Sequence, residues 1–320
     1  MFALARKLHS AGVLGIGQRN LDFTTRYNPR RLYPLVDDKL ITKNLARQQG
    51  VAVPELYGVL KFQGEVRRLS ALLEGHPDFV IKPAHGSGGE GVIVIEGREE
   101  NMFRKSSGEL LSIEQLEHHS LNILGGLYSL GAHPDNAMIE YRVRFDPAFE
   151  KISYQGVPDV RIIVFLGVPV MAMLRLPTRA SDGRANLHQG AIGVGINMTD
   201  GRTCNAVWRN RKIARHPDTN APVSGVQIPG WENLLRLASR CHGMTGLGYQ
   251  GVDLVLDRDL GPLLLEVNAR PGLGIQIANN SGLLLRLRAV EDAIPILLDE
   301  DARLAFAQNN FGIGKPSRGK

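Results

Sequence analysis

The chain has 320 residues, 43% of them hydrophobic and 22% charged, a balance typical of globular proteins that bury a substantial core. Only Cys204 and Cys241 are present, which excludes a disulfide framework and a CxxC metal motif, so we expect two plain buried or half-buried thiols. The net charge of +6 is compatible with nucleic acid, an anionic membrane face or an anionic substrate.

Two features narrow these choices. The longest strongly apolar stretch, 162–174, contains a glycine and a proline and is shorter than the ~20 residues that span a bilayer. The N-terminal segment is too weakly apolar for a signal-peptide core, so we expect no membrane span and a cytoplasmic protein. The segment 140–216 contains twelve basic and six acidic residues. The basic residues are spread over expected strands and loops, which favours an anionic substrate over nucleic acid.

Three successive parts are expected along the chain. Residues 1–36 contain an Asn/Arg/Pro-rich stretch without clear periodicity, which we interpret as an arm and linker. From Asp37, apolar residues recur at helical spacing up to Gly50, which predicts a helix. The chain from 37 to 310 is predicted as α+β, with a small lobe at about 76–138, a strand-rich lobe at about 139–310 and a flexible tail at 311–320.

Individual elements follow from composition and spacing. Ser112 is predicted to cap a helix that extends to about Leu124, and a second helix is predicted at 231–245. Apolar, β-branched runs predict strands. These runs are 80–82, 92–95, 137–143, 160–166, 168–175, 191–196, 252–256 and 263–267.

The segment between the first two runs reads Gly86-Ser87-Gly88-Gly89-Glu90-Gly91. It is neither a Walker A loop nor a dinucleotide fingerprint, because no Gly-Lys-Ser/Thr follows and the next residues are strand-like. A glycine hairpin lets backbone N–H groups approach phosphate oxygens, although a merely flexible hairpin is the alternative. Lys82, at the end of the preceding run, can reach the same phosphates as a point charge, which favours phosphate binding.

A second polar group belongs to the last two strand-like runs, with Asp253 in one and Glu266 and Asn268 in the other. Residues two apart in a strand share a face, and Asp253 joins them if the strands are neighbours. Carboxylate and amide oxygens suit Mg²⁺ held jointly with phosphates, whereas the alternative is a glutamate on the surface of an edge strand. Arg270 would carry positive charge toward the same edge.

Several motifs follow one another in a fixed order. They are Lys39 at a helix start, Lys82 with the glycine hairpin, Ile139-Glu140-Tyr141, Asp159-Val160-Arg161, Asn186-Leu187-His188 with Gly190, Asp253, and Glu266-Val267-Asn268 with Pro271-Gly272. From about residue 37 to 285, this series resembles RimK-type ATP-grasp α-L-glutamate ligases. The segments 175–183 and 185–190 look most like the subgroup called α-L-glutamate ligase-like proteins. The resemblance implies an ATP-grasp fold of two α+β lobes clamping ATP, with a truncated N-terminal region.

The resemblance also implies roles for single residues. Lys39 and Lys82 would contact the α and β phosphates beneath the 86–91 loop. The backbone of Glu140 and Tyr141 would contact the adenine edge. Asp159 would lie near the ribose, Arg161 would belong to the cofactor site, and Asn186 would lie by the γ phosphate. Asp253, Glu266 and Asn268 would hold two Mg²⁺ ions, with Mn²⁺ as a substitute. Arg175 would stabilise charge on the acyl phosphate or tetrahedral intermediate, and the other implied catalytic residues are Lys82, Asn186 and Arg270.

The implied activity is an ATP- and Mg²⁺-dependent, ADP-forming carboxylate–amine ligase that acts through an acyl phosphate, with glutamate, another amino acid or a peptide among its substrates. His188 suits hydrogen bonding better than general-base work, because nearby cations disfavour its protonated form. The alternatives are an ATP-binding regulatory or partner-binding module, or a ligase for a polyanionic or glycan-linked carboxylate. Only 38 residues precede Lys39, where family ligases usually have an α/β domain, so we expect a homo-oligomer or partner to complete the acceptor site.

Overall fold

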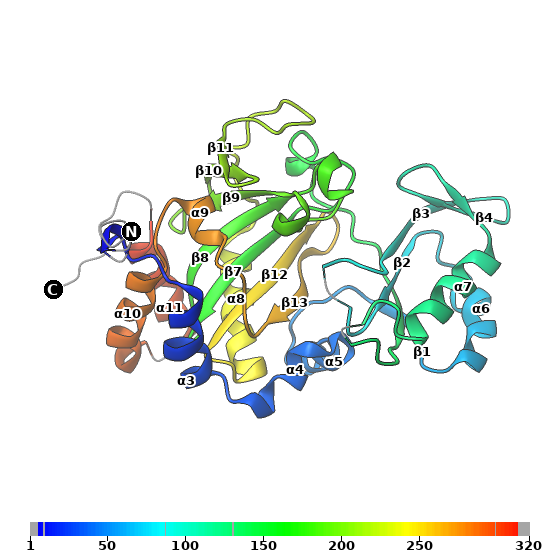
Figure 1. Cartoon of the computed structure of the whole chain (residues 1–320), viewed down its shortest axis with the longest axis horizontal. Coiled ribbons are helices and arrows are strands. Elements are labelled where there is room, and N and C mark those ends of the chain that lie inside the picture. Colours follow the sequence, from blue (N-terminus) through cyan, green and yellow to red (C-terminus); the bar gives the residue numbers. More distant parts are fainter. Residues whose placement is uncertain (1–5, 9, 87, 130, 298, 313–320) are drawn as a thin grey trace. The chain divides into compact units, whose positions relative to one another are not determined.

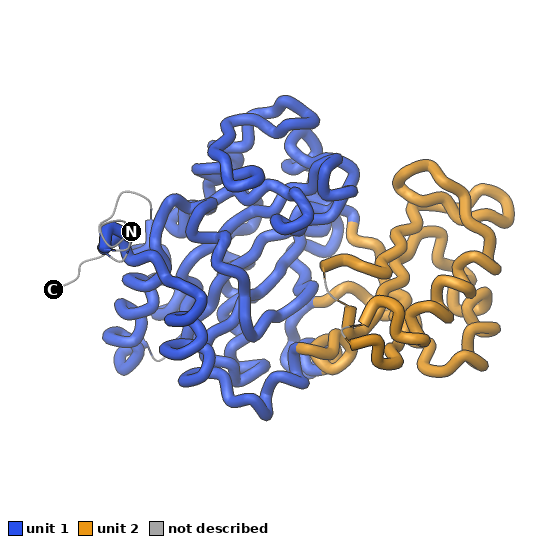
Figure 2. The backbone as a smooth tube through the Cα atoms, viewed as in Figure 1, with its two compact units in different colours: residues 1–36, 45–52, 144–320 blue, residues 37–44, 53–143 orange. Residues whose placement is uncertain are grey.

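The computed structural model describes residues 6–8, 10–86, 88–129, 131–297 and 299–312. The chain divides into two compact units (Figure 2). Unit 1 contains 1–36, 45–52 and 144–320, and unit 2 contains 37–44 and 53–143. The small lobe expected at about 76–138 lies within unit 2, which extends beyond it on both sides. Of the strand-rich lobe expected at about 139–310, residues 139–143 belong to unit 2 and the residues from 144 onward belong to unit 1.

Unit 2 is built on a six-stranded antiparallel sheet with strand order β1-β6-β2-β3-β4-β5 (Figure 1). Its strands are β1 (Leu56–Leu60), β2 (Phe79–Pro83), β3 (Ile93–Glu99), β4 (Met102–Lys105), β5 (Leu110–Leu111) and β6 (Ala137–Glu140). Its helical elements are the start of α5 (Lys39–Gln48), a 3₁₀ turn (Gln63–Arg68), α6 (Leu69–Leu72) and α7 (Ile113–Leu124). Leucines and phenylalanines of these elements form one buried core, in which Phe79 and Leu116 are fully buried.

The start of α7 shows how sequence sets a local boundary. The Ser112 hydroxyl accepts a hydrogen bond from the Gln115 N–H, and the Gln115 side chain accepts one from the Ser112 N–H at 2.8 Å. This capping box satisfies two backbone donors that a helix start leaves unpaired. The predicted helix from Ser112 to about Leu124 is confirmed.

Unit 1 is built on a seven-stranded antiparallel sheet with strand order β11-β10-β9-β8-β7-β12-β13. Its strands are β7 (Asp159–Phe165), β8 (Val168–Leu176), β9 (Ile192–Ile196), β10 (Thr203–Trp208), β11 (Arg211–Ile213), β12 (Tyr249–Asp257) and β13 (Gly261–Asn268). The longer helices are α8 (Trp231–Thr245), α9 (Ile275–Asn279), α10 (Leu284–Ala293) and α11 (Glu300–Asn310). The central strands β8 and β12 are buried along their whole length, so the residues they carry are held rigidly.

The N-terminal stretch, expected as an arm and linker, packs into unit 1 as a series of short helical segments. These are α2 (Ile16–Gln18), a π-helical turn (Arg19–Thr24), α3 (Thr25–Tyr27), a 3₁₀ turn (Arg30–Leu32) and α4 (Pro34–Asp37). Phe23 is fully buried, and the Asn28 amide donates to the carbonyl oxygens of Tyr249 and Ala269. The stretch is therefore tied to the first residue of β12 and to the residue that follows β13.

Most of the predicted regular elements are confirmed. The helices expected at 37–50 and 231–245 correspond to α5 and α8, and the predicted strands correspond to β2, β3, β6 to β9, β12 and β13. The sequence reading did not anticipate β1, β4, β5, β10 or β11, nor the three helices after β13. Most of the tail at 311–320 lies outside the described residues. Within the described part of the chain, no helix has the length and apolarity to cross a membrane.

Candidate functional site

Three charged side chains of unit 2 form a compact buried cluster. The Glu140 carboxylate at the end of β6 accepts from Lys43 Nζ at 2.6 Å and lies 2.5 Å from Lys82 Nζ. Burial alone would raise the pKa of Glu140, but the two lysines outweigh it and hold the pKa below its ordinary value. Glu140 thus stays ionised, and its ion pairs hold both ammonium groups in place. The sequence prediction placed only backbone of Glu140 at a ligand.

Lys43 was not among the predicted site residues, although the sequence held a signal for it. It lies one helical turn after Lys39 on α5, and residues four apart on a helix share a face. Because Lys43 shares a helix face with Lys39, a predicted phosphate-binding residue, the sequence could have identified Lys43 as a candidate site residue. Its ammonium also donates to the Pro54 carbonyl at 2.6 Å, which fixes α5 to the start of the following segment.

Lys39 and the glycine hairpin lie together, as the predicted roles require. The Lys39 ammonium donates to the carbonyl oxygens of Ala84 and Gly86, so it sits at the entrance of the hairpin between β2 and β3. Three glycines of the hairpin adopt positive φ, a conformation that side chains disfavour. They are Gly88 at 66°, Gly89 at 79° and Gly91 at 71°. Ser87, also predicted to contact phosphate, lies outside the described residues.

The backbone N–H of Tyr141, predicted to contact adenine, already takes part in a hydrogen bond. The Tyr141 N–H donates to the Glu55 carbonyl at 2.8 Å, directly after β6. A purine that takes a hydrogen bond from this N–H would therefore have to displace the Glu55 carbonyl. The role of Tyr141 stays a prediction.

In unit 1, charged residues from four neighbouring strands form a row on one face of the sheet. Asp159 on β7 is the register partner of Arg175 on β8, and Asp253 on β12 is the register partner of Arg161 on β7. Glu266 on β13 is in turn the partner of Asp253. Because directly paired residues on antiparallel strands point to the same side, these five side chains share one face. The expectation that Asp253 joins Glu266 if their strands are neighbours is confirmed.

Within this charged row, the arginines and aspartates are bound to each other. Arg161 makes a bidentate contact with Asp253, at 2.6 Å from Nε and 2.5 Å from Nη2. Arg175 makes a bidentate contact with Asp159 and also donates to Asp253 at 2.8 Å. Two guanidinium and two carboxylate groups therefore pair with one another; Asp159, Arg175 and Asp253 are buried and Arg161 is half-buried.

Burial and charge act differently on the two carboxylates. Burial raises the pKa of Asp159 to about 6; Asp253 adds to this, and Arg175 opposes it. Burial would also raise the pKa of Asp253, but Arg161 and Arg175 outweigh it and lower that pKa. Asp253 therefore loses its proton at a lower pH than Asp159 does. Asp159, predicted near a ribose, is in this structure a partner of Arg175.

The predicted metal ligands differ in how available they are. Glu266 and Asn268 are half-buried and two residues apart on β13, so a carboxylate and an amide oxygen lie on the same face. The Asp253 oxygens already accept hydrogen bonds from Arg161 and Arg175. The Asn268 Nδ2 lies 3.5 Å from Asp253 Oδ2. Among the residues that the structure describes, no three His, Cys, Asp or Glu side chains form a metal-holding group. The donor set fits Mg²⁺ through Glu266 and Asn268, with Asp253 adding negative charge.

Asn186 heads a short 3₁₀ turn (Leu187–Gln189), and its side-chain oxygen accepts from the His188 N–H at 3.0 Å. A Cβ at Gly193, the register partner of Arg175, would lie 3.0 Å from the Leu187 side chain. The turn therefore covers the face of the sheet that carries the charged row. His188 itself is exposed.

Arg270 is the predicted residue that the structure places apart from the charged row. Its side chain is exposed, and its guanidinium lies over the Tyr33 ring at 4.9 Å from the centroid. Arg19 donates to its carbonyl oxygen at 3.4 Å and to that of Pro271 at 2.8 Å. A catalytic role for Arg270 stays a prediction.

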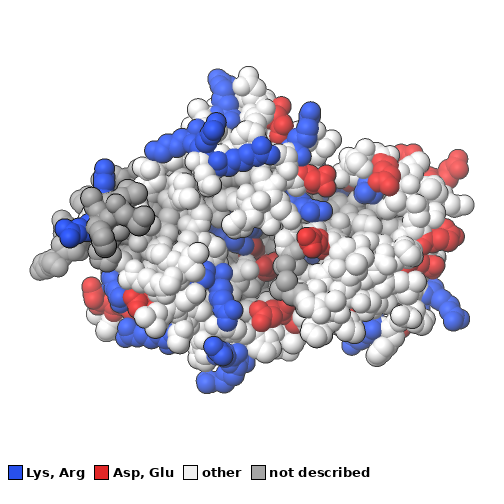
Figure 3. All heavy atoms as spheres, in the orientation of Figure 1, with Lys and Arg blue, Asp and Glu red and all other residues white. Residues whose placement is uncertain are grey.

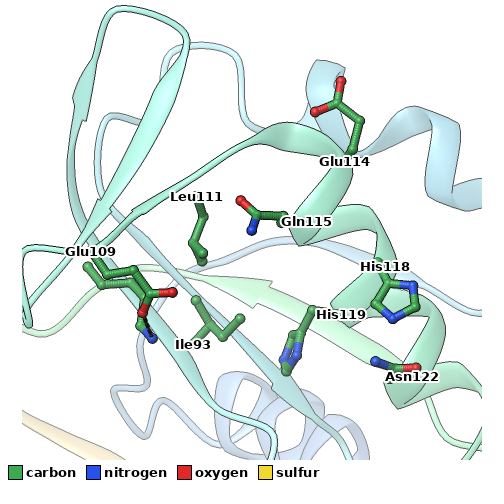
Figure 4. A pocket seen from close by; sticks show the side chains of 9 residues that line it. Ile93, Glu109, Leu111, Glu114, Gln115, His118, His119 and Asn122 are labelled. Carbon is green, nitrogen blue, oxygen red and sulfur yellow. Dashed lines mark hydrogen bonds and ion pairs between the residues drawn. The ribbon is translucent and has the colours of Figure 1, made fainter.

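Unit 2 also has a pocket of about 470 Å³ between α7 and the strands β3 to β5 (Figure 4). Glu109, His118 and His119 are among its lining residues, and none of the described predicted site residues lines it. His119 Nε2 lies 2.9 Å from the Gly91 carbonyl, and burial lowers the pKa of His119. The imidazole is therefore neutral with its proton on Nε2, and it anchors the end of the glycine hairpin to α7.

Two antiparallel sheets, a glycine hairpin entered by lysines and a strand-borne carboxylate–amide pair together define an ATP-grasp protein. Over residues 18–292 the chain matches the family model described as sugar-transfer associated ATP-grasp. This match covers most of the chain. The chain belongs to the sugar-transfer associated ATP-grasp family.

Curated relatives of the chain are named as probable alpha-L-glutamate ligases. The chain is 25% identical over 236 residues to a probable alpha-L-glutamate ligase of Enterobacter sp. (strain 638), which covers 74% of the chain and 56% of that protein. It is 27% identical over 256 residues to the probable alpha-L-glutamate ligase of Histophilus somni (strain 2336), covering 79% of the chain and 62% of that protein. The chain therefore spans little more than half the length of the curated relatives it matches.

Solved structures of ATP-grasp ligases are also similar. The ATP-grasp ligase PsnB complexed with its minimal precursor has a TM-score of 0.45 and 17% identity, over 87% of this chain and 62% of that one. The D-alanine–D-alanine ligase from Bacillus anthracis complexed with ATP has a TM-score of 0.43 and 15% identity, over 87% of this chain and 67% of that one.

Proposed function

We propose that the chain is an ATP- and Mg²⁺-dependent carboxylate–amine ligase that forms ADP and an acyl phosphate before it forms an amide. Family membership and the names of the curated relatives support this reaction class, with an amino acid such as glutamate as the amine. The observation that supports it most is the charged row of unit 1, where Arg175 lies among Asp159, Asp253 and the neighbouring Glu266.

The chemistry requires such an arrangement. The γ-phosphoryl group leaves the bridging oxygen of ADP and bonds to a carboxylate oxygen; the amine nitrogen then attacks the acyl carbon, phosphate leaves, and the amine loses a proton to solvent. In the first step two anions approach each other, so fixed cations are needed to offset their repulsion. Arg175 supplies one that is always charged, because two carboxylates raise its pKa despite its burial.

The two units have separate roles in this proposal. Lys39, Lys43 and Lys82 of unit 2 supply positive charge for the nucleotide phosphates, and Asn186 of unit 1 supplies a neutral hydrogen-bonding group for the γ phosphate. Mg²⁺, with Mn²⁺ as a substitute and two ions in all, would be held by Glu266 and Asn268 with the charge of Asp253 and would neutralise the phosphate oxygens.

The products test the reaction class. We expect ATP to be converted to ADP and phosphate only when a carboxylate substrate is present, and hydroxylamine to trap the acyl phosphate as a hydroxamate. The measurement is a screen of carboxylates and amino acids with nucleotide analysis and mass spectrometry. Stoichiometric AMP would indicate adenylation and contradict the proposal. Binding of ATP without turnover in any substrate combination would favour a regulatory module.

A substitution at Lys82 tests the nucleotide role of unit 2. We expect Lys82→Ala to weaken ATP binding about tenfold or more, because a charge-assisted contact to phosphate contributes about 1.5–3 kcal/mol. The measurement is calorimetric titration with a non-hydrolysable ATP analogue. Lys61→Ala is the matched control, since Lys61 is an exposed lysine of the same unit. Equal affinities of Lys82→Ala and wild type would remove Lys82 from the phosphate site.

A further inference from the structure

A strongly basic hairpin lies at one edge of the unit 1 sheet. Strands β10 and β11 form it, and the segment 202–216 around them contains no acidic residue. We call this segment the basic hairpin; its cations are Arg202, Arg209, Arg211, Lys212 and Arg215. Figure 3 shows Lys and Arg side chains gathered over this part of the surface.

These cations form no ion pair within the part of the chain that the structure describes. All five side chains are exposed, and none forms an ion pair with a described carboxylate. Two of them donate to backbone carbonyls instead, Arg202 to Gly225 at 3.3 Å and Arg215 to Asn220 at 2.7 Å. A group of like charges without counter-ions raises the local potential and attracts anions. By contrast, the exposed Arg240 forms an ion pair, with its Nε 2.9 Å from Glu300 Oε2.

An aromatic ring lies among these cations. Trp208 is the register partner of Arg211, and Arg209 lies over the indole with its guanidinium carbon 4.9 Å from the ring centroid. Arg209 and Asn210 both have positive φ, at 47° and 61°, the conformation of a tight two-residue hairpin turn. The turn therefore places the Arg209 guanidinium against a half-buried indole, with Arg211 paired opposite that tryptophan.

The same indole ties the basic hairpin to the turn that carries Asn186. The Trp208 indole N–H donates to the Gly190 carbonyl at 2.8 Å, and Thr178 Oγ1 donates to the same oxygen at 2.8 Å. Gly190 ends the turn that Asn186 begins. A ligand on the basic hairpin would therefore lie next to the segment proposed to contact the γ phosphate.

We propose that the basic hairpin binds an anionic glycan, the saccharide part of the substrate whose carboxylate the ligase activates. Guanidinium groups pair bidentately with carboxylate or phosphate groups, and an aromatic face packs against the C–H face of a sugar ring. A single indole offers no ladder of rings for stacking successive bases, which argues against single-stranded nucleic acid. This inference rests on the proposed ligase function and specifies its substrate class.

Tryptophan fluorescence gives a direct binding test. The chain has two tryptophans, and Trp231 is buried in α8 while Trp208 is half-exposed, so an added ligand reports mainly through Trp208. We expect oligogalacturonate to change the emission with an affinity that falls as salt is raised, and neutral malto-oligosaccharide of the same length to bind much more weakly. Arg211→Ala/Lys212→Ala should weaken oligogalacturonate binding about tenfold or more.

Matched variants and other polyanions decide the outcome. Arg67→Ala/Arg68→Ala, which removes two exposed adjacent arginines of unit 2, should bind oligogalacturonate as wild type does. Tighter binding of poly-glutamate or of a single-stranded oligonucleotide through the same residues would overturn the glycan assignment. Unchanged affinity in Arg211→Ala/Lys212→Ala would overturn the site.

The two proposals fail in different experiments. Binding is measured without ATP, so the two tests are independent. A wild-type protein that binds oligogalacturonate but never forms ADP would contradict the proposed ligase function and would retain the proposed glycan-binding site. A protein that forms ADP and amide with free amino acids but does not bind oligogalacturonate would retain the ligase function and remove the glycan inference.

Discussion

Glu266→Gln is expected to reduce Mg²⁺-dependent turnover on the order of a hundredfold or more while leaving the fold intact. The carboxylate of Glu266 lies on the same face as Asp253 and two residues from Asn268, where the proposed Mg²⁺ ligands meet. Glutamine keeps the shape but removes the negative charge that a hard divalent cation requires. Because the side chain is half-exposed, the substitution leaves no buried charge without a partner.

Two measurements separate loss of metal from loss of fold. Turnover is followed over a range of Mg²⁺ concentrations, and unfolding is followed by tryptophan fluorescence, since both tryptophans belong to unit 1. Glu150→Gln is the control, because Glu150 is an exposed glutamate of the same unit that lies 3.5 Å from Arg258. Activity of Glu266→Gln close to that of wild type at every Mg²⁺ concentration would remove Glu266 from the metal site.

The sequence predicted the elements that carry most of the proposed nucleotide and metal residues because their local signals agree. The run before Lys82 and the run after the glycine hairpin are β-branched, and the pairing of β2 with β3 follows from that pattern. The helix from Trp231 is amphipathic and ends at Gly246, which has the positive φ of a helix stop. Such signals act over a few residues, so they can be read without knowledge of the fold.

The ion pairs of the charged row could not be read in the same way. Arg161 and Asp253 are 92 residues apart, and their pairing depends on the register of β7 against β12. Sequence spacing reports that Asp159 and Arg161 share a face, but not which strand lies opposite. Arg175 and Asp253 therefore received separate roles in the sequence prediction, whereas the structure joins them by a hydrogen bond.

The missed strands have weaker local patterns. β10 contains Cys204 and Asn205 and is only partly buried, and β11 is three residues long and mostly exposed. β11 is the edge strand and β10 is the strand next to it, where burial imposes little selection for apolar side chains. The N-terminal helical segments were missed for a related reason, because each is too short to show a helical period.

Arg175→Met is expected to lower the free energy of unfolding of unit 1 by about 3–5 kcal/mol, the usual cost of breaking a buried ion pair by removing one partner. Its guanidinium accounts for both side-chain bonds of Asp159 and for one of Asp253. Without it, two buried carboxylates share only Arg161. Since burial and Asp253 already raise the pKa of Asp159 to about 6, Asp159 would take up a proton more readily still.

The pH dependence follows from the sign of that shift. A carboxyl whose pKa is raised by folding favours the folded state below its unfolded pKa of about 4, and this contribution is lost as pH rises through the folded value. The deficit of Arg175→Met relative to wild type should therefore be larger at pH 8 than at pH 5. Equal deficits at both pH values would contradict the assignment of the raised pKa to Asp159.

Removing the unpaired carboxylate should restore part of the loss. In Asp159→Asn/Arg175→Met, Arg161 and Asp253 remain as a balanced pair, so we expect this double variant to be more stable than Arg175→Met, as coupled neighbours require. Arg236→Met is the control: Arg236 also contacts several carboxylates, but these contacts lie on the surface and are worth little. A double variant no more stable than Arg175→Met would show that packing of the arginine stem, rather than its charge, supports this part of the sheet.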